Sequence, residues 1–281
     1  SHNIVILGGG VAGLLTALRL HELGRDVCLF ESAGRLGGRI LTLPVGDGAA
    51  VDLGSTWFWP HQQRMLTELE ISWFEQYTVG DALYQMSSET VQRVNGSPSP
   101  AFRVINGMQS IIDGIAVRLP TDSIALNQTA SRLTRAGDEW EIEFAESAKL
   151  RKVRCKRLVV AIAPRVFVEI DGVDDSFSYT LMTALTGEPT WMAAQAKYVA
   201  TYDRAFWREQ GLSGDVFSRV GPMVEIHDAS TASNNPALFG FVGVPARARL
   251  SVSVSELEEA CKVQLTNIYG EDASNPTGTC L

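Results

Sequence analysis

Runs of apolar residues without polar alternation mark the buried strands near the start of the chain. Residues 4–7 (Ile-Val-Ile-Leu) and 27–30 (Val-Cys-Leu-Phe) are such runs, which are typical of strands buried on both faces of a parallel sheet. Between them, an apolar stripe extends from Leu14 to Leu23 and predicts a helix, which Gly24 is placed to end. The order strand, helix, strand predicts a parallel βαβ unit.

The remaining pattern predicts further helices and mostly antiparallel strands. Helices are expected within residues 62–74, 108–119, 174–192 and 256–269. Strands are expected over residues 123–126, 130–135, 140–144, 149–157, 157–163, 194–202, 223–227 and 238–244. The apolar run at 157–163 predicts a strand buried on both faces, whereas the basic run at 149–157 predicts a solvated hairpin strand. Residues 77–101 are polar with weak periodicity and end in a Gly/Ser/Pro-rich loop signal.

Composition narrows the possible functions without choosing one. The 281 residues suffice for two domains, and 45% hydrophobic with 20% charged residues is typical of a soluble globular protein. The net charge of −8 argues against nonspecific nucleic-acid binding and is compatible with a cationic substrate. The four cysteines and four histidines are scattered, so no metal site is expected. No signal peptide or membrane-spanning run is recognisable, and we expect a cytoplasmic protein without membrane contact.

The turn after the first strand carries the most informative motif. Gly8, Gly10 and Gly13 fit G-x-G-x-x-G, in which the glycines allow a tight turn and close approach to a pyrophosphate. The helix that follows presents backbone amides and a positive dipole end to phosphate. The second strand ends at Glu31, where a carboxylate can accept hydrogen bonds from ribose hydroxyls. The sequence therefore predicts a dinucleotide site here.

Three later segments add candidate chemistry. Residues 35–39 (Arg-Leu-Gly-Gly-Arg) combine close-approach glycines with guanidinium groups that suit phosphate oxygens. Gly54 and the small residues after it allow backbone to approach a flat ring. Lys197 lies mid-strand among apolar neighbours, where burial is costly unless the ammonium has a partner. An edge position for this lysine is the alternative.

Together these blocks resemble the flavin-containing amine oxidase family, which includes monoamine and polyamine oxidases. The resemblance rests on the glycine turn, Glu31, the Arg35–Arg39 loop, Asp52-Leu53-Gly54, Ala161-Ile162-Ala163-Pro164, and Lys197 followed by Tyr202 and Phe206-Trp207. It implies an α/β fold, with a Rossmann-like FAD-binding domain and a second α+β substrate domain on a mostly antiparallel sheet. The implied FAD domain comprises residues 1–76 and 102–170, and the substrate domain comprises 77–101 and 171–281.

The resemblance implies FAD as cofactor and assigns roles residue by residue. Glu31 is expected to hold the adenosine ribose, Arg39 the pyrophosphate and Ala130 the adenine, while Gly54 to Trp57 line the flavin ring. Lys197 is expected to hold a water near the reactive flavin nitrogen. The full cofactor set is Gly8, Gly10, Val11, Ala12, Gly13, Glu31, Ser32, Arg35, Gly38, Arg39, Gly54, Ser55, Thr56, Trp57 and Ala130. Candidate substrate residues are Trp57, Trp191 and Tyr198.

The implied activity is oxidation of an amine to an imine, with oxygen as acceptor and hydrogen peroxide as product. Some positions depart from the family pattern: Ser55 replaces a frequent glycine, Ala33 replaces an arginine, and residues 77–101 are shorter than the usual helical cap. The last block of the family, which closes the FAD domain, is expected to be absent. The alternatives are a desaturase or protoporphyrinogen oxidase-like enzyme, and a flavin-binding protein without turnover.

Overall fold

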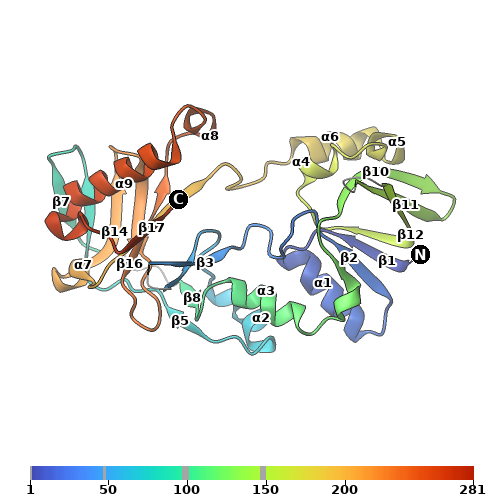
Figure 1. Ribbon diagram of the computed structural model, residues 1–281, viewed down its shortest axis with the longest axis horizontal. Helices are drawn as coiled ribbons and strands as arrows, with labels where there is room; N and C mark the ends of the chain where they lie inside the picture. Colours follow the sequence, from blue (N-terminus) through green and yellow to red (C-terminus); the bar gives the residue numbers. More distant parts are fainter. Residues whose placement is uncertain (1, 47–48, 97–100, 146–149) are drawn as a thin grey trace. The chain divides into compact units, whose positions relative to one another are not determined.

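The computed structural model describes residues 2–46, 49–96, 101–145 and 150–281 (Figure 1). The end of the predicted loop, residues 97–100, and residue 149 of a predicted strand lie outside these ranges. The chain divides into two compact units. Unit 1 comprises Ser1–Arg39 and Ile111–Trp191, and unit 2 comprises Ile40–Ser110 and Met192–Leu281.

Unit 1 contains the predicted βαβ motif within a six-stranded sheet. Its strands are β1 (His2–Leu7), β2 (Val27–Phe30), β9 (Ile124–Ala125), β10 (Thr129–Ala136), β11 (Glu139–Ala145) and β12 (Leu150–Val160), in the order β10-β11-β12-β1-β2-β9. β1 pairs in parallel with β2 and β12, and helix α1 (Val11–Glu22) connects β1 to β2. The prediction for this first motif is confirmed.

Strand β12 replaces the two strands predicted over 149–157 and 157–163. It runs without interruption, pairing antiparallel with β11 from Leu150 to Cys155 and parallel with β1 from Cys155 to Val160. The expected burial on both faces is wrong, because Leu158 and Val159 are half-buried and Val160 is 37% exposed. Leu158 packs against the core of unit 1, and exposure increases toward the end of the strand at Val160.

Short helices follow β12 and cover the hydrophobic core of unit 1. They are α4 (Pro164–Phe167), α5 (Val173–Ser176) and α6 (Tyr179–Gly187). Phe167 and Val173 pack with Leu133, Ile142 and Phe144 of the β10–β11 hairpin. The single helix predicted within 174–192 is therefore two short ones, the second of which begins at the N-cap Ser178.

Unit 2 is organised around a seven-stranded, mostly antiparallel sheet. Its strands are β6 (Asp81–Gln85), β7 (Val91–Val94), β13 (Ala196–Thr201), β14 (Leu212–Ser218), β15 (Met223–Asp228), β16 (Ala237–Val242) and β17 (Gly278–Cys280), in the order β17-β13-β16-β15-β14-β6-β7. β13, β15 and β16 were expected. β14 was not expected, and β6 and β7 lie within the polar segment 77–101, where no strand was predicted.

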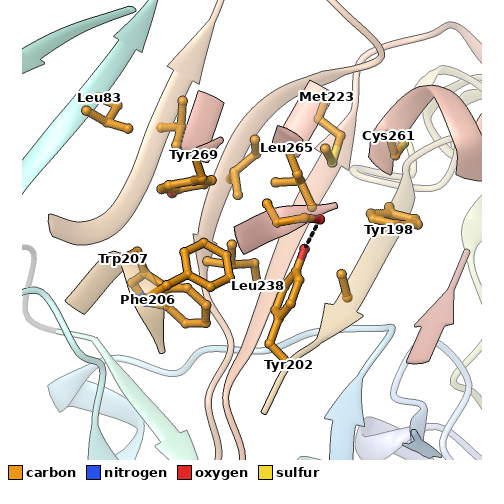
Figure 2. Packing of buried hydrophobic residues seen from close by; sticks show 14 of the residues in the cluster. Leu83, Tyr198, Tyr202, Phe206, Trp207, Met223, Leu238, Cys261, Leu265 and Tyr269 are labelled. Carbon is orange, nitrogen blue, oxygen red and sulfur yellow. Dashed lines mark hydrogen bonds between the residues drawn. The ribbon is translucent and has the colours of Figure 1, made fainter. Parts of the chain in front are cut away.

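Helix α9 (Val254–Tyr269) lies across one face of this sheet (Figure 1). Ser253 and Glu256 form a capping box at its start, which satisfies amides that the first helical turn leaves unpaired. Its buried residues Leu257, Cys261 and Leu265 pack in one cluster with side chains of the sheet. Figure 2 shows Cys261 and Leu265 in this cluster. The predicted helix over 256–269 is confirmed and begins two residues earlier.

Unit 2 also contains two two-stranded antiparallel sheets, β3 (Thr42–Val45) with β4 (Ala49–Asp52), and β5 (Trp73–Glu75) with β8 (Phe102–Val104). The helix predicted over 62–74 is wrong in its second half. A 3-10 turn (Pro60–Gln62) and α2 (Gln63–Glu68) are followed by Glu70 at a φ of 58° and then by β5. Pairing with β8, distant in the sequence, overrides the local helical pattern.

The remaining elements complete the chain: α3 (Gln109–Ala116), α7 (Phe206–Glu209), α8 (Ala246–Arg249), and the 3-10 turns Thr121–Ser123 and Glu271–Ala273. The compact units differ from the predicted domains, because residues 40–76 and 102–110 group with the second sheet and residues 171–191 with the first. Hydrogen bonds from Lys197 of β13 to Asp52, Gly54 and Thr56 help to explain this grouping. The functional division into an FAD and a substrate domain stays a prediction.

Candidate functional site

The glycine turn of unit 1 joins β1 to α1 by close backbone contacts. Gly8 has a φ of 109°, a conformation that L side chains rarely adopt. A Cβ on Gly13 would lie 1.9 Å from the carbonyl oxygen of Gly8, so only glycine lets α1 pack this closely on the turn. A Cβ on Gly10 would meet nothing within 4 Å. Gly10 therefore leaves open space beside the start of α1, where backbone amides point outward.

Glu31 follows β2 and lies against this turn. The backbone amide of Gly9 donates to its Oε2 at 2.6 Å, and the amide of Ala33 donates to Oε1 at 2.8 Å. The Ser32 hydroxyl also donates to Oε1, at 3.2 Å. These bonds fix the carboxylate of Glu31, which is 8% exposed, next to the glycine turn, as a ribose-binding acid requires.

The Arg35–Arg39 loop is joined to the same turn by backbone pairing. The amide of Gly37 donates to the carbonyl of Gly9 at 2.8 Å. The guanidinium of Arg35 donates to the carbonyl of Gly38 at 2.7 Å, and that of Arg39 donates to the carbonyl of Trp191 at 3.0 Å. The loop therefore lies next to the glycine turn, and both of its arginines donate hydrogen bonds to backbone carbonyls.

Ala130 belongs to β10, where it pairs with Phe144. The segment just before it is tied to the Glu31 region, because the amide of Gln128 donates to the carbonyl of Glu31 at 2.8 Å. Residues predicted to hold adenine and ribose are therefore linked through one short stretch of backbone.

The unit 2 site centres on Lys197, whose side chain is buried. Its Nζ donates to the carbonyls of Asp52 at 3.0 Å and Gly54 at 2.6 Å and to the hydroxyl of Thr56. Three acceptors match the three protons of an ammonium group. Burial lowers the pKa of Lys197 to about 7, although the carboxylate of Asp52 acts in the opposite direction. The predicted need for a partner is thereby met.

Asp52 connects this lysine to the chain that leads into α3. Its Oδ1 accepts from the amide of Met108 at 2.8 Å and from the hydroxyl of Thr42. Burial raises the pKa of Asp52, while these hydrogen bonds oppose the rise. The carboxylate of the Asp-Leu-Gly block therefore anchors the backbone that carries Gly54.

Aromatic rings surround the lysine on the same side of the sheet. Nζ of Lys197 lies 4.5 Å from the ring centre of Phe239 and 5.7 Å from that of Phe241. Trp57 packs against Phe239 with ring centres 5.2 Å apart, and its indole nitrogen donates to Gln76 at 2.9 Å. The structure thus brings Lys197 together with Gly54, Thr56 and Trp57, whereas Ser55 is exposed.

Of the other two candidate substrate residues, Tyr198 does not join this group and Trp191 belongs to unit 1. Tyr198 neighbours Lys197 on β13, and successive side chains of a strand point to opposite faces. Its ring is accordingly buried in the core under α9, where Figure 2 shows it near Cys261. Trp191 is the last residue of unit 1 and is 77% exposed.

Two polar groupings in unit 2 were not predicted from the sequence. Asp228 is buried and accepts from the indole of Trp207 at 2.7 Å and from Arg208 at 2.7 and 2.9 Å. The side chain of His227 lies on the face of β15 opposite to that of Asp228 and contacts the carboxylate of Asp215. The alternation of Glu225 and His227 in a predicted strand was the available signal, because it places two polar side chains on one face.

Among the described residues, no group of three potential ligands suited to a metal ion is found, and no helix is long and apolar enough to span a membrane. The β1–α1–β2 unit with its glycine turn has the form of a Rossmann-like dinucleotide-binding motif. Residues 6–69 match the family described as NAD(P)-binding Rossmann-like domain, and residues 70–281 match the family described as flavin containing amine oxidoreductase.

Individual relatives agree with these family matches. The putrescine oxidase of Kocuria rosea is 34% identical in an alignment over 392 residues that covers 98% of this chain and 80% of that protein. The alignment is longer than the 281-residue chain, so the relative has residues opposite gaps in this chain. The flavin-containing amine oxidase B of Cavia porcellus is 30% identical over 128 residues, covering 43% of this chain and 25% of that protein.

Solved structures show the same fold. A putrescine oxidase bound to putrescine superposes with a TM-score of 0.83 at 20% identity, covering 99% of this chain and 84% of that one. The cyclohexylamine oxidase of Brevibacterium oxydans gives a TM-score of 0.85 at 16% identity, covering 100% and 84%. The chain belongs to the flavin-containing amine oxidoreductase family and is an FAD-dependent enzyme.

Proposed function

We propose that this protein oxidises an amine to an imine with oxygen as the electron acceptor, giving hydrogen peroxide. The observation that carries the proposal is the buried Lys197, which donates to the carbonyl of Gly54 and lies beside Phe239 and Phe241, against which Trp57 packs. When bound, the flavin accepts the hydride from the substrate carbon, so the protein has to supply position and electrostatics.

The proposed cofactor contacts are those of the sequence analysis. The open space at Gly10 and the fixed carboxylate of Glu31 fit the ADP half of FAD. The amides at the start of α1 would face the pyrophosphate, and Glu31 would accept from ribose hydroxyls. Arg35 and Arg39 would exchange a backbone carbonyl for a phosphate oxygen, which is the stronger partner because it is charged.

The proposed role of Lys197 is to hold a water molecule beside the flavin ring and assist the reaction with oxygen. Its pKa of about 7 supports this role, because the side chain exists in both protonation states near neutral pH. Its anchoring bonds to Asp52 and Gly54 fix the position of the nitrogen. Lys197 is thus a candidate for proton exchange with that water.

The proposed substrate is an aliphatic amine, bound in its neutral form against aromatic rings. The relative that aligns with nearly the whole chain is a putrescine oxidase, and the neighbouring rings of Trp57, Phe239 and Phe241 provide apolar surface that suits an alkyl chain. Molecular oxygen is the proposed second substrate. A cytoplasmic location stays a prediction.

The test compares the wild type with Lys197→Met in the FAD-loaded protein, following anaerobic flavin reduction and reoxidation by oxygen separately in stopped flow. We expect reoxidation to slow by about 100-fold or more, a typical loss for one proton-transfer group, with a smaller effect on reduction. Lys262→Met is the control, because Lys262 belongs to α9 and pairs with Glu259. Equal slowing of both steps would contradict the proposed role of Lys197.

The broader proposal has its own test, which is an anaerobic screen of flavin bleaching by primary amines, diamines and amino acids. Bleaching by an amine, followed by peroxide release on aeration, is the expected result. A yellow protein that no amine bleaches would instead indicate flavin binding without amine turnover.

A further inference from the structure

The indole of Trp57 is held at its polar edge by the side-chain amide of Gln76. Its Nε1 donates to Oε1 of Gln76 at 2.9 Å. The indole also packs against the rings of Phe239, Phe241 and His227, with ring centres 5.2, 6.2 and 4.9 Å away. Such ring contacts tolerate a range of tilts, whereas a hydrogen bond weakens steeply when its angle departs from linear. The bond to Gln76 therefore fixes the direction of the indole N–H and the orientation of the ring.

The amide of Gln76 fits its surroundings in one orientation. Its Nε2 donates to the backbone carbonyl of Tyr77 at 3.1 Å and to that of Asp228 at 2.9 Å. Both protons of the amide nitrogen are thereby used, while Oε1 accepts from Trp57. Turning the amide over would bring Oε1 against two carbonyl oxygens and the amino group against the indole N–H. Gln76 is therefore a fixed acceptor for the indole.

The amide of Gln76 is supported from two sheets of unit 2. Gln76 directly follows β5, and its backbone amide donates to the carbonyl of Ala101 at 3.0 Å, next to β8. Asp228 ends β15 and is 1% exposed, and its carboxylate pairs with Arg208. The side chain of Gln76 thus connects the small β5–β8 sheet to the seven-stranded sheet. Trp57 receives its hydrogen-bond acceptor from this connection.

The backbone that carries Trp57 is held by a second set of bonds. Lys197 donates to the carbonyl of Gly54 at 2.6 Å and to the hydroxyl of Thr56, the residue before Trp57. Nζ of the same lysine lies 4.5 Å from the centre of the Phe239 ring, on which Trp57 packs. Lys197 therefore anchors the chain leading to Trp57, and Gln76 anchors its ring.

We propose that Gln76 is a positioning residue for amine oxidation, which holds the indole of Trp57 in the orientation that presents its apolar face to the substrate. This inference rests on the proposed function and adds a residue that acts on the substrate only through another side chain. Without the acceptor of Gln76, the indole N–H has to find another partner. The ring then turns, and the apolar surface beside Phe239 changes shape.

The first test observes Trp57 directly, in the FAD-loaded protein labelled with ¹⁵N-tryptophan. The chain has six tryptophans, and the indole signal that is absent from the NMR spectrum of Trp57→Phe is that of Trp57. Gln76→Met removes the amide and keeps the length of the side chain. We expect the Trp57 indole proton to shift upfield and to exchange faster with solvent, because its hydrogen bond is lost. An unmoved signal would overturn the proposal.

The second test separates positioning from structural damage by a double-mutant cycle. The constants kcat and KM for n-butylamine are compared in wild type, Gln76→Met, Trp57→Phe and the double variant. We expect Gln76→Met to lower kcat/KM about tenfold, the size of one hydrogen bond, chiefly by raising KM. It should have no further effect in the Trp57→Phe background, because a phenylalanine ring has no N–H to place. A loss that persists in that background would overturn the proposal.

Two further variants complete the set. Gln76→Glu keeps an acceptor for the indole and loses the donors to the two carbonyls, so it should keep the Trp57 signal downfield and restore most of kcat/KM. The same loss as in Gln76→Met would assign the effect to those donors and contradict the proposal. Gln92→Met is the matched control at an exposed glutamine of β7 and should behave as the wild type.

Failure of this inference is distinguishable from failure of the proposed function. If n-butylamine reduces the flavin equally well in wild type and Gln76→Met, amine oxidation stands and the positioning role is wrong. If no amine reduces the flavin of the wild type but the Trp57 signal still shifts in Gln76→Met, the hold on Trp57 stands and the proposed oxidation is wrong.

Discussion

The candidate sites of the two units differ in the kind of atoms that form them. In unit 1 the decisive atoms belong to the backbone, because the turn depends on Gly8 and Gly13 having no side chain. In unit 2 the decisive atoms belong to buried side chains, above all Nζ of Lys197 and the rings beside it. A backbone site is sensitive to volume, whereas a buried side-chain site is sensitive to charge.

This difference predicts opposite responses to mutation and pH. Adding one methyl group should damage the unit 1 site and leave its pH dependence unchanged. Removing one amino group should leave volume almost unchanged in unit 2 and alter its pH dependence. The variants below test each half of the comparison.

The largest effect is expected for Gly13→Ala. The added Cβ would lie 1.9 Å from the carbonyl oxygen of Gly8, which is backbone and has little room to move. Overpacking of this kind costs about 3 kcal/mol in the free energy of unfolding, measurable by urea denaturation, and FAD content should fall with it. Gly24→Ala is a poor control because of its positive φ, so Gly187→Ala, with open space around it, serves instead. A stable, yellow Gly13→Ala protein would contradict the backbone account.

The next effect is the pH dependence contributed by Lys197. Its pKa is lowered to about 7 in the folded protein, so between this value and its ordinary pKa of 10.5 the unfolded chain binds more protons. The free energy of unfolding therefore rises with pH in this window, by up to about 1.4 kcal/mol per pH unit.

Urea denaturation of the wild type and Lys197→Met at two pH values between 7 and 9 isolates this contribution. We expect the stability difference between them to shift in favour of the wild type as the pH increases. A difference that is constant with pH would show that Lys197 keeps its ordinary pKa.

The smallest effect on stability is expected for Gly10→Ala. Its Cβ would meet nothing within 4 Å, so the free energy of unfolding should change by less than about 0.5 kcal/mol. The methyl group would instead occupy the space through which the pyrophosphate approaches, and FAD affinity should fall by about tenfold. Fluorescence titration of the apoprotein with FAD measures this. Unchanged affinity would place the pyrophosphate elsewhere.

Local signals were enough to predict the motif around β1, α1 and β2, because glycine spacing and apolar runs encode it within about thirty residues. They were not enough for Trp73–Glu75, which reads as part of a helix and becomes a strand by pairing with Phe102–Val104. Likewise β6 and β7 have weak patterns of their own, and β14, to which β6 pairs, is more than a hundred residues away.

The candidate site shows the same limit. Lys197 was identified from its apolar surroundings, and simple alternation would already have separated it from Tyr198, which faces the other side of β13. The pairing of His227 with Asp215 depends on the register of β14 and β15. Register of that kind is set by the packed sheet, so no spacing in the sequence reveals it.

Strand β12 has a consequence for the order in which the protein folds. Its first half pairs with β11, a neighbour in the sequence, whereas its second half pairs with β1, some 150 residues away. Local hairpins close at lower entropic cost and faster than ladders between distant segments. We therefore expect the β10–β12 meander to form first and to template the docking of β1. The nucleotide cradle would then be among the last parts of the chain to mature, and FAD would select molecules that have completed folding.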